Sequence, residues 1–224
     1  MFEPEKYPSA PYLQRHEEIF GKAKWRRQPS SRTGICALGL EPNPKFLAIH
    51  RVIEEDYALQ GWKVKFLAVA AGDHEGKLVF NLDPDDKAKS DWGFSQYTAS
   101  MKGHDGLLTE EVKVEAFGDF VGRINATVPS GIRLVKMDIE GSEYDVIPDL
   151  LKKGMLCQNT LGHLTIEWHS RSPAFNWTQA ELRRFARIED LATHHSCPAS
   201  EQTVVEPFDD ESYLQDGQAL PPPG

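Results

Sequence analysis

Residues 132–151, IRLVKMDIEGSEYDVIPDLL, predict the fold of this chain more clearly than any other stretch. The first half is a short and mostly apolar run, typical of a strand buried on both faces of a parallel sheet. Gly141 permits a sharp turn, and the apolar side chains that follow it recur at helical spacing. The stretch therefore predicts a strand, a turn that carries two acids, and a helix. In open α/β sheets, ligands bind just outside the carboxyl ends of such strands.

Other strands and helices are predicted to alternate along the chain. Apolar runs predict strands at residues 34–40, 64–69, 112–117, 161–169 and 203–208, and helical spacing predicts helices at residues 11–21, 44–61, 118–124 and 178–195. The strand at 64–69 is expected to run on and return at residues 78–80 as a hairpin. Strands that alternate with helices form a mostly parallel sheet. We expect one α/β domain over residues 1–208, followed by an acidic and proline-rich tail over residues 209–224.

Composition narrows the class of protein. The 224 residues carry a net charge of −9, which argues against a nucleic-acid or anionic-membrane surface. No apolar run approaches the roughly 20 residues of a membrane span, and the first residues lack the apolar core of a signal peptide. The three cysteines form no CxxC pair, so we expect reduced thiols. These features predict a cytoplasmic protein without a nucleic-acid partner or a membrane span, and leave the oligomeric state open.

Acids, and in one case a histidine, follow three of the predicted strands. Glu41 follows the first, Asp138 and Glu140 follow the strand of the opening stretch, and Glu167 and His169 end the next one. If the last two strands are neighbours, three carboxylates and an imidazole converge on one crevice. Such a cluster could hold a hard cation, or His169 could serve as a general base near neutral pH. The same acids could instead pair with nearby basic residues or cap turns.

Glu41 stands just before a strong helix start. Asn43 is a good N-cap, and Pro44 suits the first helical position. An acid at the end of a strand in a nucleotide-binding α/β fold commonly accepts hydrogen bonds from ribose hydroxyls. Glu41 could have that role, or it could be an exposed acid favoured by the dipole of the following helix.

Five segments resemble the FkbM-type methyltransferases, and they occur in the order of that family. The segments are CALGLEPNPKFL, FLAVAAGDHEGKLVF, VEAFGDFVGRI, LVKMDIEGSEYDVI and HLTIEWH, and the resemblance covers roughly residues 35–169. The blocks EPNP and KMDIEGSE are the most specific. The resemblance implies a Rossmann-like class I methyltransferase sheet and S-adenosyl-L-methionine as the cofactor. It also implies O-methylation of a small-molecule or sugar hydroxyl.

The resemblance further implies roles for individual residues. Glu41 would hold the cofactor ribose, the turn at Ala70 and Ala71 would lie near the adenine, and Asp138 and Glu140 would sit near the reacting methyl group. The expected cofactor-binding residues are Glu41, Asn43, Ala70, Ala71 and Asp138, and the expected catalytic residues are His169, Asp138, Glu140 and Glu167. His169 is the expected base, and no metal ligand is assigned.

One feature departs from the family pattern. The family's first strand and glycine-rich turn, roughly D-x-G-x-N-x-G, should precede the helix at residues 11–21, yet the ten residues before it include no glycine. We therefore expect an N-terminally truncated sheet that binds the cofactor weakly or not at all, which leaves the activity of this chain open. The alternatives are a metal-dependent hydrolase or phosphotransferase built on the cluster, and a non-catalytic methyltransferase-like binding protein.

Overall fold

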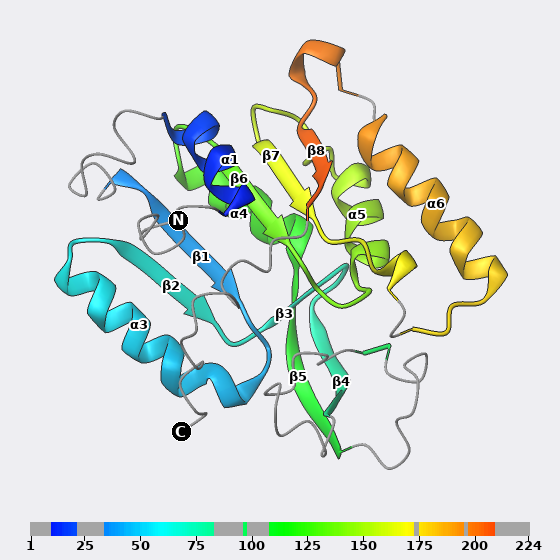
Figure 1. Cartoon of the computed structure of the whole chain (residues 1–224), viewed down its shortest axis with the longest axis horizontal. Helices are drawn as coiled ribbons and strands as arrows, with labels where there is room; N and C mark the ends of the chain where they lie inside the picture. The colour runs from blue at the N-terminus through cyan, green and yellow to red at the C-terminus, as the bar shows by residue number, and fades with distance from the viewer. Residues whose placement is uncertain are drawn as a thin grey trace. The chain divides into compact units, whose positions relative to one another are not determined.

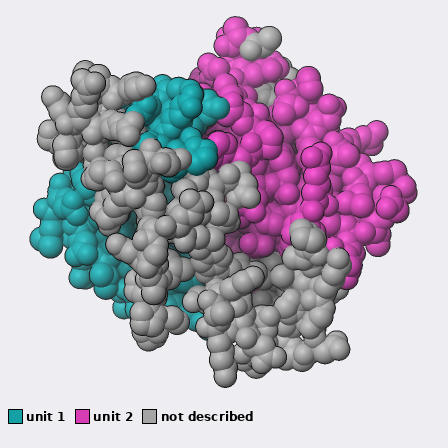
Figure 2. Space-filling view, viewed as in Figure 1, with its two compact units in different colours: residues 1–68, 209–224 teal, residues 69–208 magenta. Residues whose placement is uncertain are grey.

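The computed structural model describes residues 10–21, 34–82, 96–97, 108–172, 175–194 and 197–208. The chain divides into two compact units, unit 1 with residues 1–68 and 209–224, and unit 2 with residues 69–208 (Figure 2). The predicted tail lies outside the described residues, and a single domain over residues 1–208 stays a prediction. No helix of the described residues is long and apolar enough to cross a membrane.

Unit 1 contains a β-α-β arrangement. Strand β1 (Cys36–Leu40) pairs in parallel with β2 (Lys63–Leu67), and the 3-10 turn η2 (Pro44–Phe46) and helix α3 (Leu47–Leu59) connect them (Figure 1). The predicted cap is confirmed, because Asn43 Oδ1 accepts a hydrogen bond from Lys45 N at 3.0 Å. The predicted first helix is also present as α1 (Pro11–Phe20), with Gly21 as its C-cap.

The first sheet of unit 2 differs from the predicted hairpin. It contains β3 (Ala70–Gly72), β4 (Gly76–Leu82) and β5 (Leu108–Ala116), and β5 lies between the other two. Strand β5 runs parallel to β3 over three residue pairs and antiparallel to β4 over seven. The predicted hairpin, in which the strand at residues 64–69 returns at residues 78–80, is therefore wrong. Residues 63–67 form β2, which pairs with β1, and residues 76–82 form β4, which pairs with β5. The physical reason is that β1 and β5 satisfy the backbone groups of these two strands, so they do not pair with each other.

The second sheet of unit 2 is parallel, with β7 (Leu161–Ile166) between β6 (Ile132–Met137) and β8 (Val204–Pro207). Helix α4 (Phe117–Thr127) precedes β6, α5 (Glu143–Lys152) connects β6 to β7, and α6 (Gln179–Thr193) lies between β7 and β8 in the chain. Helix α5 contacts both α4 and α6, so the three helices form a layer beside the sheet (Figure 1). The core of this unit contains fully buried side chains of α5 and β7, among them Tyr144, Ile147, Leu150, Leu161, Leu164 and Ile166.

These elements confirm the predicted fold class. The chain is a mixed α/β protein with mostly parallel sheets, consistent with a Rossmann-like methyltransferase fold. One boundary differs from the prediction, because β7 ends at Ile166 and His169 begins the 3-10 turn η4 (His169–Arg171).

The cysteines also differ from the prediction. Cys157 and Cys197 form a disulfide with their Cα atoms 5.9 Å apart, and Cys36 is a free, exposed thiol. The 40-residue separation gives no signal in the sequence, since the two residues meet only when the segment before β8 folds back. Backbone contacts hold that segment in place, including Gln158 N to Glu201 O at 2.7 Å. Disulfides persist mainly in oxidising compartments, so a cytoplasmic location stays a prediction that this bond does not support.

Candidate active site

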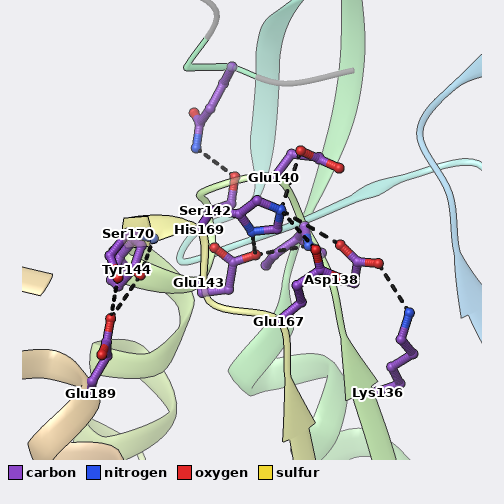
Figure 3. Close-up of polar contacts among 12 residues, drawn as sticks. Lys136, Asp138, Glu140, Ser142, Glu143, Tyr144, Glu167, His169, Ser170 and Glu189 are labelled. Atoms are coloured by element: carbon purple, nitrogen blue, oxygen red, sulfur yellow. Dashed lines mark hydrogen bonds and ion pairs between the residues drawn. The ribbon is translucent and has the colours of Figure 1, made fainter. Parts of the chain in front are cut away.

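The carboxyl ends of β6 and β7 meet at one edge of the second sheet. Met137 and Ile166 are register partners, and Glu167 N continues the pairing by donating to Met137 O at 2.9 Å. Asp138 follows β6 directly, and Glu167 follows β7 directly. The structure thus brings Asp138, Glu140, Glu167 and His169 together, each contributed by one of the two strand ends (Figure 3).

His169 is the centre of this cluster. Its surface is 5% exposed, and its backbone oxygen accepts a hydrogen bond from Trp177 Nε1 at 2.9 Å. The edge of the ring meets Phe175, with the ring centroids 6.0 Å apart. These contacts fix the backbone of His169 and one edge of its ring, and the two ring nitrogens face different surroundings.

One of those nitrogens meets a carboxylate that we did not predict. Nδ1 lies 3.1 Å from Glu143 Oε1, and the same oxygen accepts a hydrogen bond from Ile139 N at 2.9 Å. Glu143 is the first residue of α5 and has no exposed surface. An ionised carboxylate can accept hydrogen bonds but cannot donate one. Opposite an ionised Glu143, Nδ1 is therefore the protonated ring nitrogen and donates to Oε1. Glu143 therefore orients the ring.

The other nitrogen faces the predicted acids. Nε2 lies 3.4 Å from Glu140 Oε2, 3.8 Å from Glu167 Oε1 and 3.9 Å from Asp138 Oδ1 (Figure 3). Asp138 is also tied to its own strand, because its Oδ2 accepts from Lys136 Nζ at 3.1 Å. Three carboxylates therefore surround the Nε2 atom of His169.

The carboxylates alter the protonation of the cluster. Burial lowers the pKa of His169, but the hydrogen bond to Glu143 and the surrounding negative charges outweigh it and raise that pKa to about 9. Burial raises the pKa of Glu140 to about 7, although the charge of His169 opposes this shift. The imidazolium is thus the favoured form at neutral pH, whereas a general base requires the neutral ring. The role of His169 as a base stays a prediction.

The turn after β6 has an unusual backbone. Glu140 has a φ of 53° and Gly141 a φ of 97°, so both residues are left-handed. A β-carbon at Gly141 would lie 3.2 Å from Tyr97 Cδ2 and 3.4 Å from Trp177, so only glycine fits without strain. A non-glycine residue in this conformation costs energy and often marks a functional site. Here it turns the Glu140 carboxylate towards His169.

Glu41 and Asn43 belong to unit 1. Glu41 Oε1 accepts a hydrogen bond from Asn43 N at 2.7 Å, so this acid stabilises the helix start. The Asn43 side chain uses Oδ1 as the cap, and its Nδ2 is buried with no hydrogen-bond partner in the described part of the chain. Ala70 and Ala71 belong to unit 2, where Ala70 is buried in β3 and Ala71 is half-buried.

Glu143 is a member of this cluster that the sequence did not lead us to predict. An acid in the first turn of a helix normally faces solvent and interacts with the helix dipole. The signal that could have identified it is periodicity, since Ile147 and Leu150 follow at spacings of four and seven on the same helix face. Both are fully buried, and so is Glu143.

The family model of the methyltransferase FkbM domain matches residues 18–195. The chain belongs to the FkbM methyltransferase family. This confirms the resemblance seen in the sequence and indicates a methyltransferase. No curated protein and no solved structure matches the chain.

Proposed function

We propose that this FkbM-family chain is an S-adenosyl-L-methionine-dependent methyltransferase that methylates a hydroxyl group of a small molecule or glycan. The observation that carries the proposal is the cluster of Asp138, Glu140, Glu167 and His169 where two adjacent parallel strands end. Ligands bind at this edge of open α/β sheets, and the cluster places charged groups there. Family membership supplies the reaction class.

The end of β1 is suited to a ribose. A buried amide donor without a partner is costly, and Asn43 Nδ2 is such a donor among the described residues. Its assignment as the nitrogen is supported because Oδ1 accepts from Lys45 N. Ribose hydroxyls both accept and donate, so one could accept from Asn43 and donate to the Glu41 carboxylate beside it.

The cluster in unit 2 is suited to the reacting groups. When bound, S-adenosyl-L-methionine supplies a methyl group on a positively charged sulfur. The negative charge of Asp138 and Glu140 would favour the positively charged sulfur nearby. The same two side chains would orient the acceptor hydroxyl in line with the methyl group. His169 would take the hydroxyl proton from its Nε2 side when that nitrogen is unprotonated, with Glu143 holding the ring.

Titration calorimetry with S-adenosyl-L-methionine tests the ribose role of Glu41. Glu41→Gln keeps an oxygen that can accept from Asn43 N but removes the charge, so the helix start is retained. We expect the affinity for the cofactor to fall by roughly 10- to 150-fold, the equivalent of about 1.5–3 kcal/mol. Glu55→Gln, at an exposed position on α3, is the control and should bind as the wild type does. Equal affinity in Glu41→Gln would leave Glu41 as a helix-start acid.

Transfer of a radiolabelled methyl group to a panel of hydroxyl acceptors tests the reaction itself. Cofactor binding without transfer to any acceptor would favour the non-catalytic alternative, and absence of binding would contradict the proposal for this chain.

A further inference from the structure

The Nε2 atom of His169 has a feature that the proposed methyl transfer does not explain. A charge-assisted hydrogen bond between nitrogen and a carboxylate is about 2.7–2.9 Å long. The three carboxylate oxygens around Nε2 lie at 3.4, 3.8 and 3.9 Å. The imidazole is almost buried, and each distance from its Nε2 to a carboxylate oxygen is longer than a charge-assisted hydrogen bond.

The separation between Nε2 and Glu140 Oε2 matches that between neighbouring ligands of a metal ion, and the other two are 0.4 and 0.5 Å longer. With metal–ligand bonds of about 2.1 Å, adjacent ligands lie about 3.0–3.4 Å apart. One ligand atom each from Asp138, Glu140 and His169 lies within 4.8 Å of the other two. An ion at their centre would be no more than about 2.8 Å from each atom, so side-chain shifts of under about 1 Å would complete the bonds.

The residue behind the ring supplies an independent observation. Metal-binding histidines commonly donate their second ring hydrogen to a carboxylate, which fixes the tautomer and directs the other nitrogen at the metal. Glu143, on α5, has this relation to Nδ1 at 3.1 Å. It is fully buried, and its Oε2 has no hydrogen-bond partner within the residues described. A buried acid held against the far side of an imidazole is costly unless the ring carries positive charge or a bound cation.

We propose that His169, Asp138 and Glu140 bind a divalent transition-metal ion, with Glu167 beside them and Glu143 orienting the imidazole. One imidazole nitrogen with carboxylate oxygens suits ions such as Mn²⁺, Co²⁺ or Zn²⁺ better than Ca²⁺, which prefers oxygen ligands only. This site goes beyond the proposed methyl transfer and does not depend on the methyl donor. Nε2 cannot ligate a metal ion and accept a proton at the same time. With the ion bound, the ion in place of His169 would activate a hydroxyl oxygen placed next to it.

Binding of Mn²⁺ to the chelator-treated full chain tests this site in the absence of S-adenosyl-L-methionine. Electron paramagnetic resonance follows the loss of the free Mn²⁺ signal. We expect the wild type to bind one equivalent, and Asp138→Asn and Glu140→Gln to weaken binding by more than tenfold. Glu143→Gln keeps its oxygen acceptor and should weaken binding by about 10- to 100-fold, the usual effect of losing a carboxylate behind a ligating histidine. Glu111→Gln, in an exposed ion pair on β5, is the matched control and should bind normally.

A thermal-unfolding measurement distinguishes a variant that has lost the metal site from a variant that folds poorly. Mn²⁺ or Zn²⁺ should raise the melting temperature of the wild type and of Glu111→Gln, but not that of Glu140→Gln, whose side chain is partly exposed. Absence of Mn²⁺ and Zn²⁺ binding by the wild type would overturn the proposal. Equal binding by the wild type, Asp138→Asn and Glu140→Gln would overturn it as well. Neither result bears on cofactor binding or methyl transfer, which are measured separately.

Discussion

In unit 1, β1 and β2 run parallel and are connected by η2 and α3; in unit 2, β6 and β7 run parallel and are connected by α5. Each pair comes from short apolar runs, and an acid follows one or both of its strands. Their packing differs. No residue of β1 or β2 is buried, and Leu38 is 44% exposed. In β7, by contrast, Leu161, Leu164 and Ile166 have no exposed surface.

The difference shows that an apolar run predicts a strand more securely than it predicts burial. Burial depends on what covers each face of the strand, and this is decided by segments distant in the sequence. The acids at the strand ends of the two units also differ in their surroundings. At the end of β1, Glu41 accepts from a backbone amide two residues away. At the ends of β6 and β7, the acids surround a buried imidazole, and a buried acid supports it from behind.

A matched pair of leucine substitutions is the strongest test of this contrast. Leu164→Ala opens a cavity in a fully buried strand and should lower the free energy of unfolding by about 2–5 kcal/mol. Leu38→Ala removes the same atoms from a half-exposed strand and should cost well under half as much. Urea unfolding followed by circular dichroism measures both. Similar losses for the two variants would mean that the two strand pairs are equally well packed in solution.

The disulfide adds a second difference between the units, since Cys157 and Cys197 both belong to unit 2. Replacing both by serine should lower the free energy of unfolding by about 2–4 kcal/mol, because a 40-residue loop is no longer closed in the unfolded chain. Cys36→Ser, at the exposed free thiol, should have no measurable effect. Free-thiol titration of the unfolded wild type should find one thiol, and a count of three would contradict the bond.

Removing a helix cap should change stability less than removing a buried side chain, because a cap stabilises only the end of its own helix. Thr178 caps α6 in a capping box with Glu181, in which Glu181 N donates to Thr178 Oγ1 at 3.3 Å. Thr178→Ala should cost about 1 kcal/mol. Thr178→Ser retains the oxygen and should cost much less. Calorimetric melting of the wild type, Thr178→Ala and Thr178→Ser measures these differences. If Thr178→Ala lost as much free energy of unfolding as Leu164→Ala, the cap would stabilise more than its own helix.

Local patterns accounted for much of the fold and for the meeting of the predicted acids. The apolar run before Asp138 and the helical spacing after Gly141 predicted β6, its turn and α5. Acids at the ends of two consecutive strands predicted the cluster, because consecutive parallel strands are commonly neighbours. The roles of those residues in binding and catalysis stay predictions.

What the sequence did not predict depends on contacts between distant residues. The insertion of β5 between β3 and β4 depends on pairing across more than 25 residues of chain, for which local periodicity carries no signal. The disulfide depends on the return of the chain before β8. Glu143 looked like an ordinary first-turn acid, and only the burial of its helix face makes it a support for His169.

The position of Trp177 has a practical consequence. Its indole nitrogen donates to the backbone oxygen of His169, and its ring stacks on Phe175 with centroids 4.8 Å apart. The ring also lies beside Gly141, where an added β-carbon would be 3.4 Å from it. Indole emission responds to nearby charge and polarity, so this side chain is a built-in optical reporter for the cluster. A chain that retains Trp177 alone of its five tryptophans would allow ligand screening by fluorescence, without a label and without knowledge of the methyl acceptor.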